Sequence, residues 1–177
     1  ATKGFFSGQR NRRGRQLGRV LATRYDEIVF EKLYPGTVQL EQNLQELLQG
    51  AETVLELNPE RRRHTIVRVD GGGGRDADVN WLLERGYFLL VKVKNWKRAK
   101  KLAQSVTHWH PDPKVPDRQI GWVETPHAYD YPTRQLAMRW PKADGQWHYR
   151  VLVFNLSDEL LFELAAQSWP RQLTQEN

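Results

Sequence analysis

The stretch TIVRVDGGGGRDADVNWLLERGYFLLVKV, residues Thr65–Val93, decides the fold because two apolar runs flank a helical segment within it. Thr65–Val69 is a β-branched run, which favours a strand. Tyr87–Val93 is almost continuously apolar, as expected for a strand buried on both faces. Two such strands joined by one short helix predict a βαβ unit with parallel strands and a right-handed crossover.

The helix inside this unit has its own start and stop signals. Either Asp76 or Asp78 can act as its N-cap, and Gly86 supplies the left-handed residue that often follows a helix. We expect the buried face of this helix to consist of Val79, Leu82 and Leu83.

The sequence before this unit predicts a hairpin and a long helix. Gln16–Arg24 and Glu27–Leu33 alternate between apolar and polar residues, which is typical of paired strands. A helical period then extends over Thr37–Leu57, with Thr37 as the expected N-cap and Asn58-Pro59 as the stop.

The sequence after the unit predicts a basic helix from Asn95 to about Val106 and then a β-rich region. Three strand-like runs follow one another: Gln119–Thr125, Thr133–Trp140 and Gln146–Asn155. Asp144-Gly145 predicts a tight turn between the last two. We expect three tryptophans of this region to lie in the sheet core (Trp122, Trp140 and Trp147), and a last helix to begin at Ser157 or Asp158.

The composition excludes several classes of protein. The 177 residues suit one domain with a buried core, and 39% hydrophobic residues are too many for a disordered chain. No apolar run is long enough to cross a membrane. The absence of cysteine excludes disulfides, thiol catalysis and cysteine-ligated zinc, and it fits a reducing cytoplasm.

The positive charge is concentrated in two segments. Residues 1–24 contain seven Lys and Arg residues and no acid, and Lys92–Lys101 contains six more, again without an acid. The formal net charge of +6 therefore comes from two basic segments in an otherwise acidic chain. Such clustering indicates a polyanionic partner, most often nucleic acid.

Asp70 is the candidate for chemistry, because it follows a predicted central strand and precedes four glycines. Ligands bind at the carboxyl ends of strands in open α/β sheets. The glycines do not form a dinucleotide motif, since position 76 is Asp and no Gly-Lys-Ser/Thr follows. A magnesium ligand explains a carboxylate here better than a phosphate cradle does. The alternative is an Asp that only organises the glycine turn.

The basic residues are candidates for DNA contact. In the second segment these are Lys92, Lys94, Lys97 and Arg98, with Trp96 among them to stack on a base or sugar. The alternative is a solvated helix face with Trp96 in the core. In the first segment the candidates are Arg10, Arg12, Arg13, Arg15 and Arg19, whose guanidinium groups match phosphate oxygens. The alternative there is a frayed terminus leading into a charged edge strand.

Three runs resemble the central part of bacterial insertion-sequence transposases with a DDE catalytic centre, of the RNase H-like (retroviral integrase) superfamily. They are GFFSGQRNRRGRQLGRV, YDEIVFEKLYPG and TIVRVDGGGGRDADVNWLLERGYFLLVKVKNWKRAKKL. WHYRVLVFNLSDELLFELA is similar to the β insertion of these enzymes. The resemblance implies an α/β, RNase H-like mixed sheet flanked by helices, with a β-rich insertion and incomplete at both ends. The implied parts are a partial catalytic core over 1–107, the insertion over 108–156, and a helix and tail over 157–177.

The resemblance also implies a function and a site. Asp70 falls on the family's second catalytic aspartate, which with two other carboxylates binds Mg or Mn for phosphodiester cleavage and strand transfer. The first aspartate precedes the arginine-rich hairpin and the glutamate follows the β insertion, so we expect an interior fragment that is inactive alone, with an unfilled place in its sheet. The implied partner is DNA at transposon ends, with no membrane and a possible homodimer, in the bacterial cytoplasm at the nucleoid. The alternative is a non-catalytic nucleic-acid-binding domain.

Overall fold

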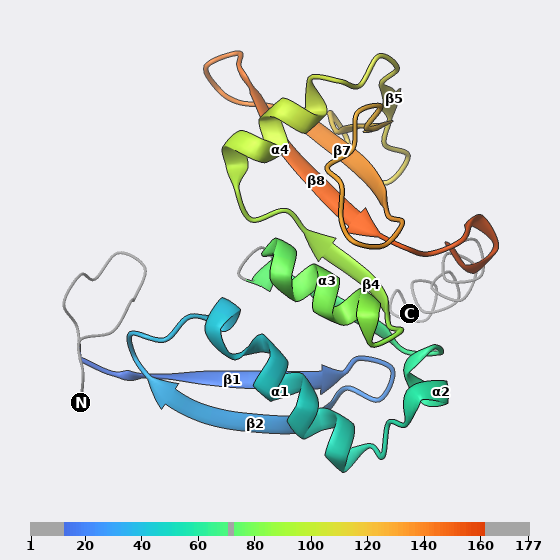
Figure 1. The fold of residues 1–177 in the computed structure, drawn as a ribbon. Helices are drawn as coiled ribbons and strands as arrows, with labels where there is room; N and C mark the ends of the chain where they lie inside the picture. The colour runs from blue at the N-terminus through green and yellow to red at the C-terminus, as the bar shows by residue number, and fades with distance from the viewer. Residues whose placement is uncertain (1–12, 71–72, 162–177) are drawn as a thin grey trace, which may run out of the picture.

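The computed structural model describes residues 13–70 and 73–161, and it is a mixed α/β structure (Figure 1). A hairpin and a helix come first, followed by a short helix and a βαβ unit, and then by a helix and a β-rich region. The elements are β1 Arg15–Ala22, β2 Glu27–Pro35, α1 Leu40–Val54, α2 Pro59–Arg62, β3 Ile66–Val69, α3 Asp76–Glu84, β4 Phe88–Lys92, α4 Trp96–Ala103, β5 His110–Pro111, β6 Gln119–Trp122, β7 Arg134–Pro141 and β8 Trp147–Phe154. Arg10, Arg12 and most of the predicted last helix lie outside the described residues.

Six strands form one mixed sheet in the order β3-β4-β8-β7-β6-β5. β3 and β4 are parallel, with Val69 opposite Val91, which confirms the predicted βαβ unit. All other neighbours in this sheet are antiparallel. The β-rich region therefore continues the same sheet through the pairing of β8 with β4. Gly86 and Gly145 have φ angles of 81° and 76°, so both predicted glycine positions are left-handed.

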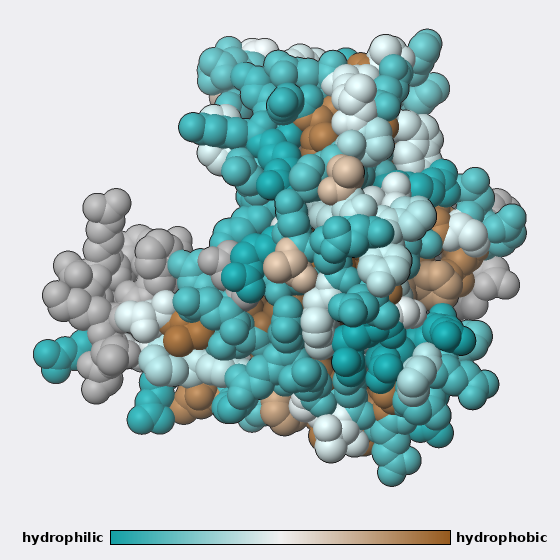
Figure 2. Space-filling view, in the orientation of Figure 1, coloured by the Kyte–Doolittle hydropathy of each residue, from teal (hydrophilic) through white to brown (hydrophobic). Residues whose placement is uncertain are grey.

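Three helices, α1, α3 and α4, cover one face of the strands (Figure 1). One continuous core lies between these helices and the alternating strand residues that face them, including Val69, Leu89, Val91, Val151 and Val153. Figure 2 shows the helix-covered face, where hydrophilic residues predominate and apolar side chains emerge only in small areas. In the part of the chain that the structure describes, no helix contributes such a core on the opposite face of the sheet.

This one-sided arrangement corrects two predictions. β4 is fully buried on one face only, since Leu89 and Val91 are buried while Phe88 and Leu90 are half-buried. The tryptophans of the β-rich region do not form its core, because Trp122 and Trp147 are exposed and Trp140 is half-buried. Arginine guanidinium groups lie against these rings instead, at 4.3 Å, 4.5 Å and 5.2 Å from the ring centroids of Trp122, Trp147 and Trp140 respectively.

The hairpin of β1 and β2 forms a separate two-stranded sheet against α1. The helix approaches the hairpin so closely that a Cβ on Gly50 would lie 2.4 Å from the Phe30 ring. α1 is shorter than predicted at both ends. Its N-cap is Gln39, which forms a capping box with Gln42, and Thr37 is not the cap. It stops at Val54 because Leu55 is the C-cap and Glu56 takes a left-handed φ of 52°.

Candidate nucleic-acid interface

The parallel pairing of β3 and β4 brings Asp70 and Lys92 together. Asp70 directly follows β3, and Lys92 is the last residue of β4. The Lys92 Nζ lies 3.1 Å from the Asp70 Oδ1. The Asp70 side chain is 84% exposed, so this carboxylate lies on the surface at the carboxyl ends of the two parallel strands. A carboxylate in this place is available to a ligand that approaches from solvent.

The glycines after Asp70 are explained by packing as far as the structure describes them. A Cβ on Gly73 would lie 2.7 Å from the Val69 Cγ1, and one on Gly74 would lie 2.4 Å from the carbonyl oxygen of Lys92. The Gly73 N–H also donates to the Asp70 carbonyl at 3.1 Å. These two glycines therefore permit the chain to pass close to β3 and β4 on its way to α3.

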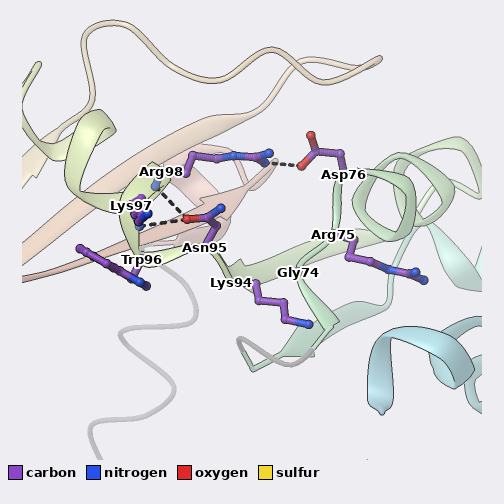
Figure 3. A pocket seen from close by; sticks show the side chains of 8 residues that line it. All are labelled: Gly74, Arg75, Asp76, Lys94, Asn95, Trp96, Lys97 and Arg98. Carbon is purple, nitrogen blue, oxygen red and sulfur yellow. Dashed lines mark hydrogen bonds and ion pairs between the residues drawn. The ribbon is translucent and has the colours of Figure 1, made fainter. Parts of the chain in front are cut away.

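A cleft of about 550 Å³ lies beside this edge, between the start of α3 and the start of α4 (Figure 3). Its lining consists of two short runs, Gly74–Asp76 and Lys94–Arg98. Asn95 fixes the start of α4, because its side-chain oxygen accepts hydrogen bonds from the backbone N–H groups of Lys97 and Arg98 at 2.9 Å and 3.2 Å. The predicted basic segment thus folds into one wall of a cleft.

The cleft combines an exposed aromatic ring with positive charge. Trp96 is 68% exposed, so the alternative that this ring packs in the core is wrong. The Lys97 Nζ lies 5.8 Å from the centroid of the Trp96 ring. Figure 3 shows Lys94 extending between the two walls, while Arg98 reaches across to Asp76.

The acidic side chains in and behind the cleft are balanced by cations. Asp76 pairs with Arg98 at 2.5 Å and with the Nε2 of His127 at 2.9 Å. Burial alone would raise the pKa of Asp76, but the hydrogen bonds from Arg98 and His127 outweigh it and hold this pKa below its usual value. Asp78 is buried and accepts from the Arg75 Nε at 3.0 Å. The remaining charge that the cleft presents is therefore positive.

The Asp76–His127 contact was not foreseen from the sequence. His127 lies in the loop between β6 and β7, 51 residues after Asp76. Tyr129 belongs to the same loop, and burial, followed by the charge of Asp76, raises its pKa to about 12. No local sequence pattern connects these residues, since they are distant in the chain and come together only through the order of the strands in the sheet.

The structure places the arginines of the first basic segment only in part. Arg13 and Arg15 are exposed, and Arg19 projects from β1, where it pairs with Glu31 at 3.0 Å. Arg19 also lines a second hollow, and Asp70 is another residue of the same lining. The predicted DNA contacts of these arginines stay predictions.

This second hollow is a groove of about 560 Å³ between the two sheets. Its walls are residues of β1 on one side and the whole of β3, continued to Asp70, on the other. Its floor is the apolar stripe of α1, formed by Leu40, Leu44, Leu47, Leu48 and Ala51. β1 pairs only with β2 and β3 pairs only with β4, so each presents an unpaired edge among the described strands.

The described residues contain neither a cluster of metal ligands nor a membrane-spanning helix. No three His, Asp or Glu side chains within 13–70 and 73–161 gather into a group that could hold a metal ion. None of the described helices has the length and apolar character needed to cross a bilayer. Comparisons with protein-family models, with curated proteins and with solved structures found no match for this chain.

Proposed function

We propose that this chain is the central part of a DDE transposase catalytic domain with an RNase H-like fold. In the whole protein it would take part in DNA transposition through metal-dependent phosphodiester cleavage and strand transfer. Its DNA partner would be the transposon ends, with Mg or Mn as cofactor, in the bacterial cytoplasm and with a possible homodimer. The observation that carries the proposal is the groove between β1 and β3, which extends to Asp70.

The groove supports the fold assignment because it meets the requirements of one further strand. A strand needs hydrogen-bonding partners along both edges and a surface that buries one face. The groove offers the unpaired edges of β1 and β3 and the leucine floor of α1. One inserted strand would join the hairpin to the six-stranded sheet, as expected for an RNase H-like sheet whose first strand is supplied by other residues.

The same insertion would bring a second acidic side chain towards Asp70. A strand parallel to β3 would end at the same edge of the sheet, where its last side chain could approach the Asp70 carboxylate. Carboxylate and phosphate oxygens are both preferred ligands of Mg²⁺. The bound metal would supply activation of the attacking oxygen and stabilisation of the leaving oxygen. Asp70 would hold that metal, and Lys92 would lie beside the phosphate.

The charges next to Asp70 fit a nucleic-acid substrate. Lys92 and Lys94 flank the edge, and Lys97 follows at the start of α4. Such a row of cations can neutralise successive backbone phosphates without reading the base sequence.

A second candidate is a non-catalytic nucleic-acid-binding domain. The observation that favours it is that the basic cleft with Trp96 is already formed, whereas no group of three His, Asp or Glu side chains that could hold a metal ion is found among the described residues. Both candidates predict that DNA affinity falls steeply as salt rises.

The effect of Mg²⁺ on DNA binding separates the two candidates. The 177-residue chain is titrated with a short mixed-sequence duplex by fluorescence anisotropy, with MgCl₂ or with NaCl at equal ionic strength. We expect Mg²⁺ to raise the affinity of the native chain, and we expect Asp70→Asn to abolish the increase. Asp117→Asn is the matched control, because Asp117 is exposed in the loop between β5 and β6 and its left-handed φ of 60° tolerates Asn.

A Mg²⁺ effect that is absent, or equal in native chain and Asp70→Asn, would favour the non-catalytic candidate. The coding sequence on either side gives an independent test. The proposal requires a strand ending in Asp upstream and a helix carrying Glu downstream, and stop codons directly adjacent on both sides would contradict an active parent.

A further inference from the structure

We propose that the cleft between α3 and α4 binds one nucleotide of an unpaired DNA strand, with its base stacked on Trp96, its own phosphate at Lys97 and the next phosphate at Lys94. This deepens the DNA contact of the proposed function and rests on it for the identity of the polymer. The proposal adds a distinct substrate class, since the cleft selects single-stranded over fully paired DNA.

The exposure of Trp96 is the first observation. Helical spacing places position 96 on the same stripe as Ala99 and Ala103, which are both buried. Trp96 is nevertheless 68% exposed, because it begins α4 at the edge of the cleft (Figure 3). An indole at this place contributes little to the core while it presents a large flat apolar surface to solvent. A stacked base would cover that surface.

The positions of the cations are the second observation. The Lys97 Nζ lies 5.8 Å from the centroid of the Trp96 ring, which is the spacing of a cation near an aromatic face. Lys94 extends into the cleft from the other side of Asn95 (Figure 3). A nucleotide stacked on Trp96 would therefore have ammonium groups near its own phosphate and the next one.

The neutralised carboxylate of Asp76 is the third observation. Asp76 is the one acidic residue of the lining, and Arg98 and His127 both contact its carboxylate. A phosphate that enters the cleft thus meets Lys94 and Lys97 without an unbalanced carboxylate between them. The pairing also fixes Arg98 as a structural link from α4 to the start of α3, which keeps the two walls of the cleft together.

Stacking on an indole distinguishes unpaired from paired strands. Inside a duplex each base has both faces covered by its neighbours, so it must leave the stack before it can lie on a protein ring. An unpaired nucleotide does this at low cost, and the contact tolerates any base because every base has a flat face. The cleft volume of about 550 Å³ is in the range of small-ligand sites, which suits one nucleotide and excludes a duplex from its interior.

The test measures how one substitution in the protein changes its affinity for three DNA probes. The native chain and Trp96→Ala are titrated by fluorescence anisotropy with a blunt duplex, the same duplex carrying a short single-stranded tail, and the single strand alone. Loss of one stacked base costs about 1–3 kcal/mol, so we expect Trp96→Ala to bind the tailed duplex and the single strand about 5- to 150-fold more weakly. Blunt-duplex affinity should change by less than about 2-fold, because its bases stay stacked.

Two further variants control the experiment. Trp96→Phe keeps a flat ring and should retain most of the preference for unpaired DNA. Tyr25→Ala removes another aromatic ring that is equally exposed, at 68%, in the turn between β1 and β2, and should leave the preference unchanged. Circular dichroism checks that each variant folds, which we expect because the substituted rings are on the surface.

The outcomes separate this inference from the proposed function. Equal weakening of all three probes by Trp96→Ala, or no weakening, would overturn the unpaired-strand site even if the Mg²⁺ effect at Asp70 is observed. A selective loss on unpaired probes without any Asp70-dependent Mg²⁺ effect would support this site and count against the transposase assignment. Binding to none of the probes would overturn both.

Discussion

Glu52 joins three elements of the core through one carboxylate. It lies in α1 and accepts hydrogen bonds from the Arg85 Nε at 3.0 Å, from the Arg85 Nη2, and from the Tyr87 hydroxyl at 2.6 Å. Arg85 is the C-cap of α3, and Tyr87 directly precedes β4. Only 10% of the Glu52 side chain is exposed, so the substitution Glu52→Ala leaves the Arg85 charge without its partner in a mostly buried place.

The expected loss of stability is large. Removing one partner of a buried pair costs about 3–5 kcal/mol, most of it from the uncompensated charge. For a chain of this size each kcal/mol shifts the midpoint of thermal unfolding by about 2–4 °C, which gives a decrease of roughly 6–20 °C. Urea unfolding followed by circular dichroism measures the free energy, and calorimetry measures the midpoint.

Glu31→Ala is the matched control. Glu31 pairs with Arg19 at 3.0 Å across the β1–β2 hairpin, but both side chains are 50% exposed. Exposed pairs contribute about 0–1 kcal/mol, so this variant should unfold close to the native chain. If Glu52→Ala loses no more than Glu31→Ala, the buried carboxylate does not join α1 to the rest of the core as we argue.

The pH dependence gives a second readout of the same group. Burial alone would raise the pKa of Glu52, but the hydrogen bonds from Arg85 and Tyr87 lower it below its ordinary value. A carboxyl group with a lowered folded-state pKa stabilises the fold above its unfolded-state pKa, and this stability is lost as pH falls through the folded-state pKa. The free energy of unfolding should therefore decrease more between neutral pH and acid in the native chain than in Glu52→Ala.

Two further substitutions test how the strands that carry the site are held. Gly74→Ala would place a methyl group 2.4 Å from the Lys92 carbonyl oxygen, which is fixed backbone, so we expect a loss of about 1–3 kcal/mol in urea unfolding, and an unchanged stability would show that the close approach is wrong. Asn155→Ala removes a side chain that accepts from the Leu89 N–H at 2.8 Å and donates to the Tyr87 carbonyl at 3.0 Å. We expect a loss of about 1–3 kcal/mol for each buried group left unpaired, together with faster amide exchange at Leu89. Unchanged exchange at Leu89 would contradict the bridging role.

Local signals in the sequence predicted the elements well. The β-branched run, the helical segment and the apolar run of Thr65–Val93 form the parallel unit that their pattern indicates, although the N-cap of α3 is Arg75 and not the predicted Asp76 or Asp78. The Asp144-Gly145 turn joins β7 to β8 as expected, since the left-handed glycine is a local requirement. Each of these features depends on residues that are neighbours in the chain.

Contacts between distant segments could not be predicted in the same way. The pairing of β8 with β4 places Val153 beside Val91, although each run alone indicates only a strand. The exposure of Trp122 follows from the face on which β6 places it, and an apolar side chain does not reveal that face. The contact of Asp76 with His127 depends on the same sheet order, so the sequence could predict the basic wall of the cleft but not how its acidic residue is held.

The ion pair of Asp70 with Lys92 contributes too little free energy to prevent a metal ion from binding to the Asp70 carboxylate. Val69 and Val91 lie opposite each other in the parallel strands, and this backbone register places Asp70 beside Lys92. The two side chains therefore stay close together even without the ion pair between them. With the Asp70 side chain 84% exposed, such a pair contributes at most about 1 kcal/mol and weakens with salt. Under the proposed function, a divalent cation could therefore displace the Lys92 ammonium at little cost. Lys92 would then remain beside the carboxylate edge, where a phosphate bound to the same cation would meet its positive charge.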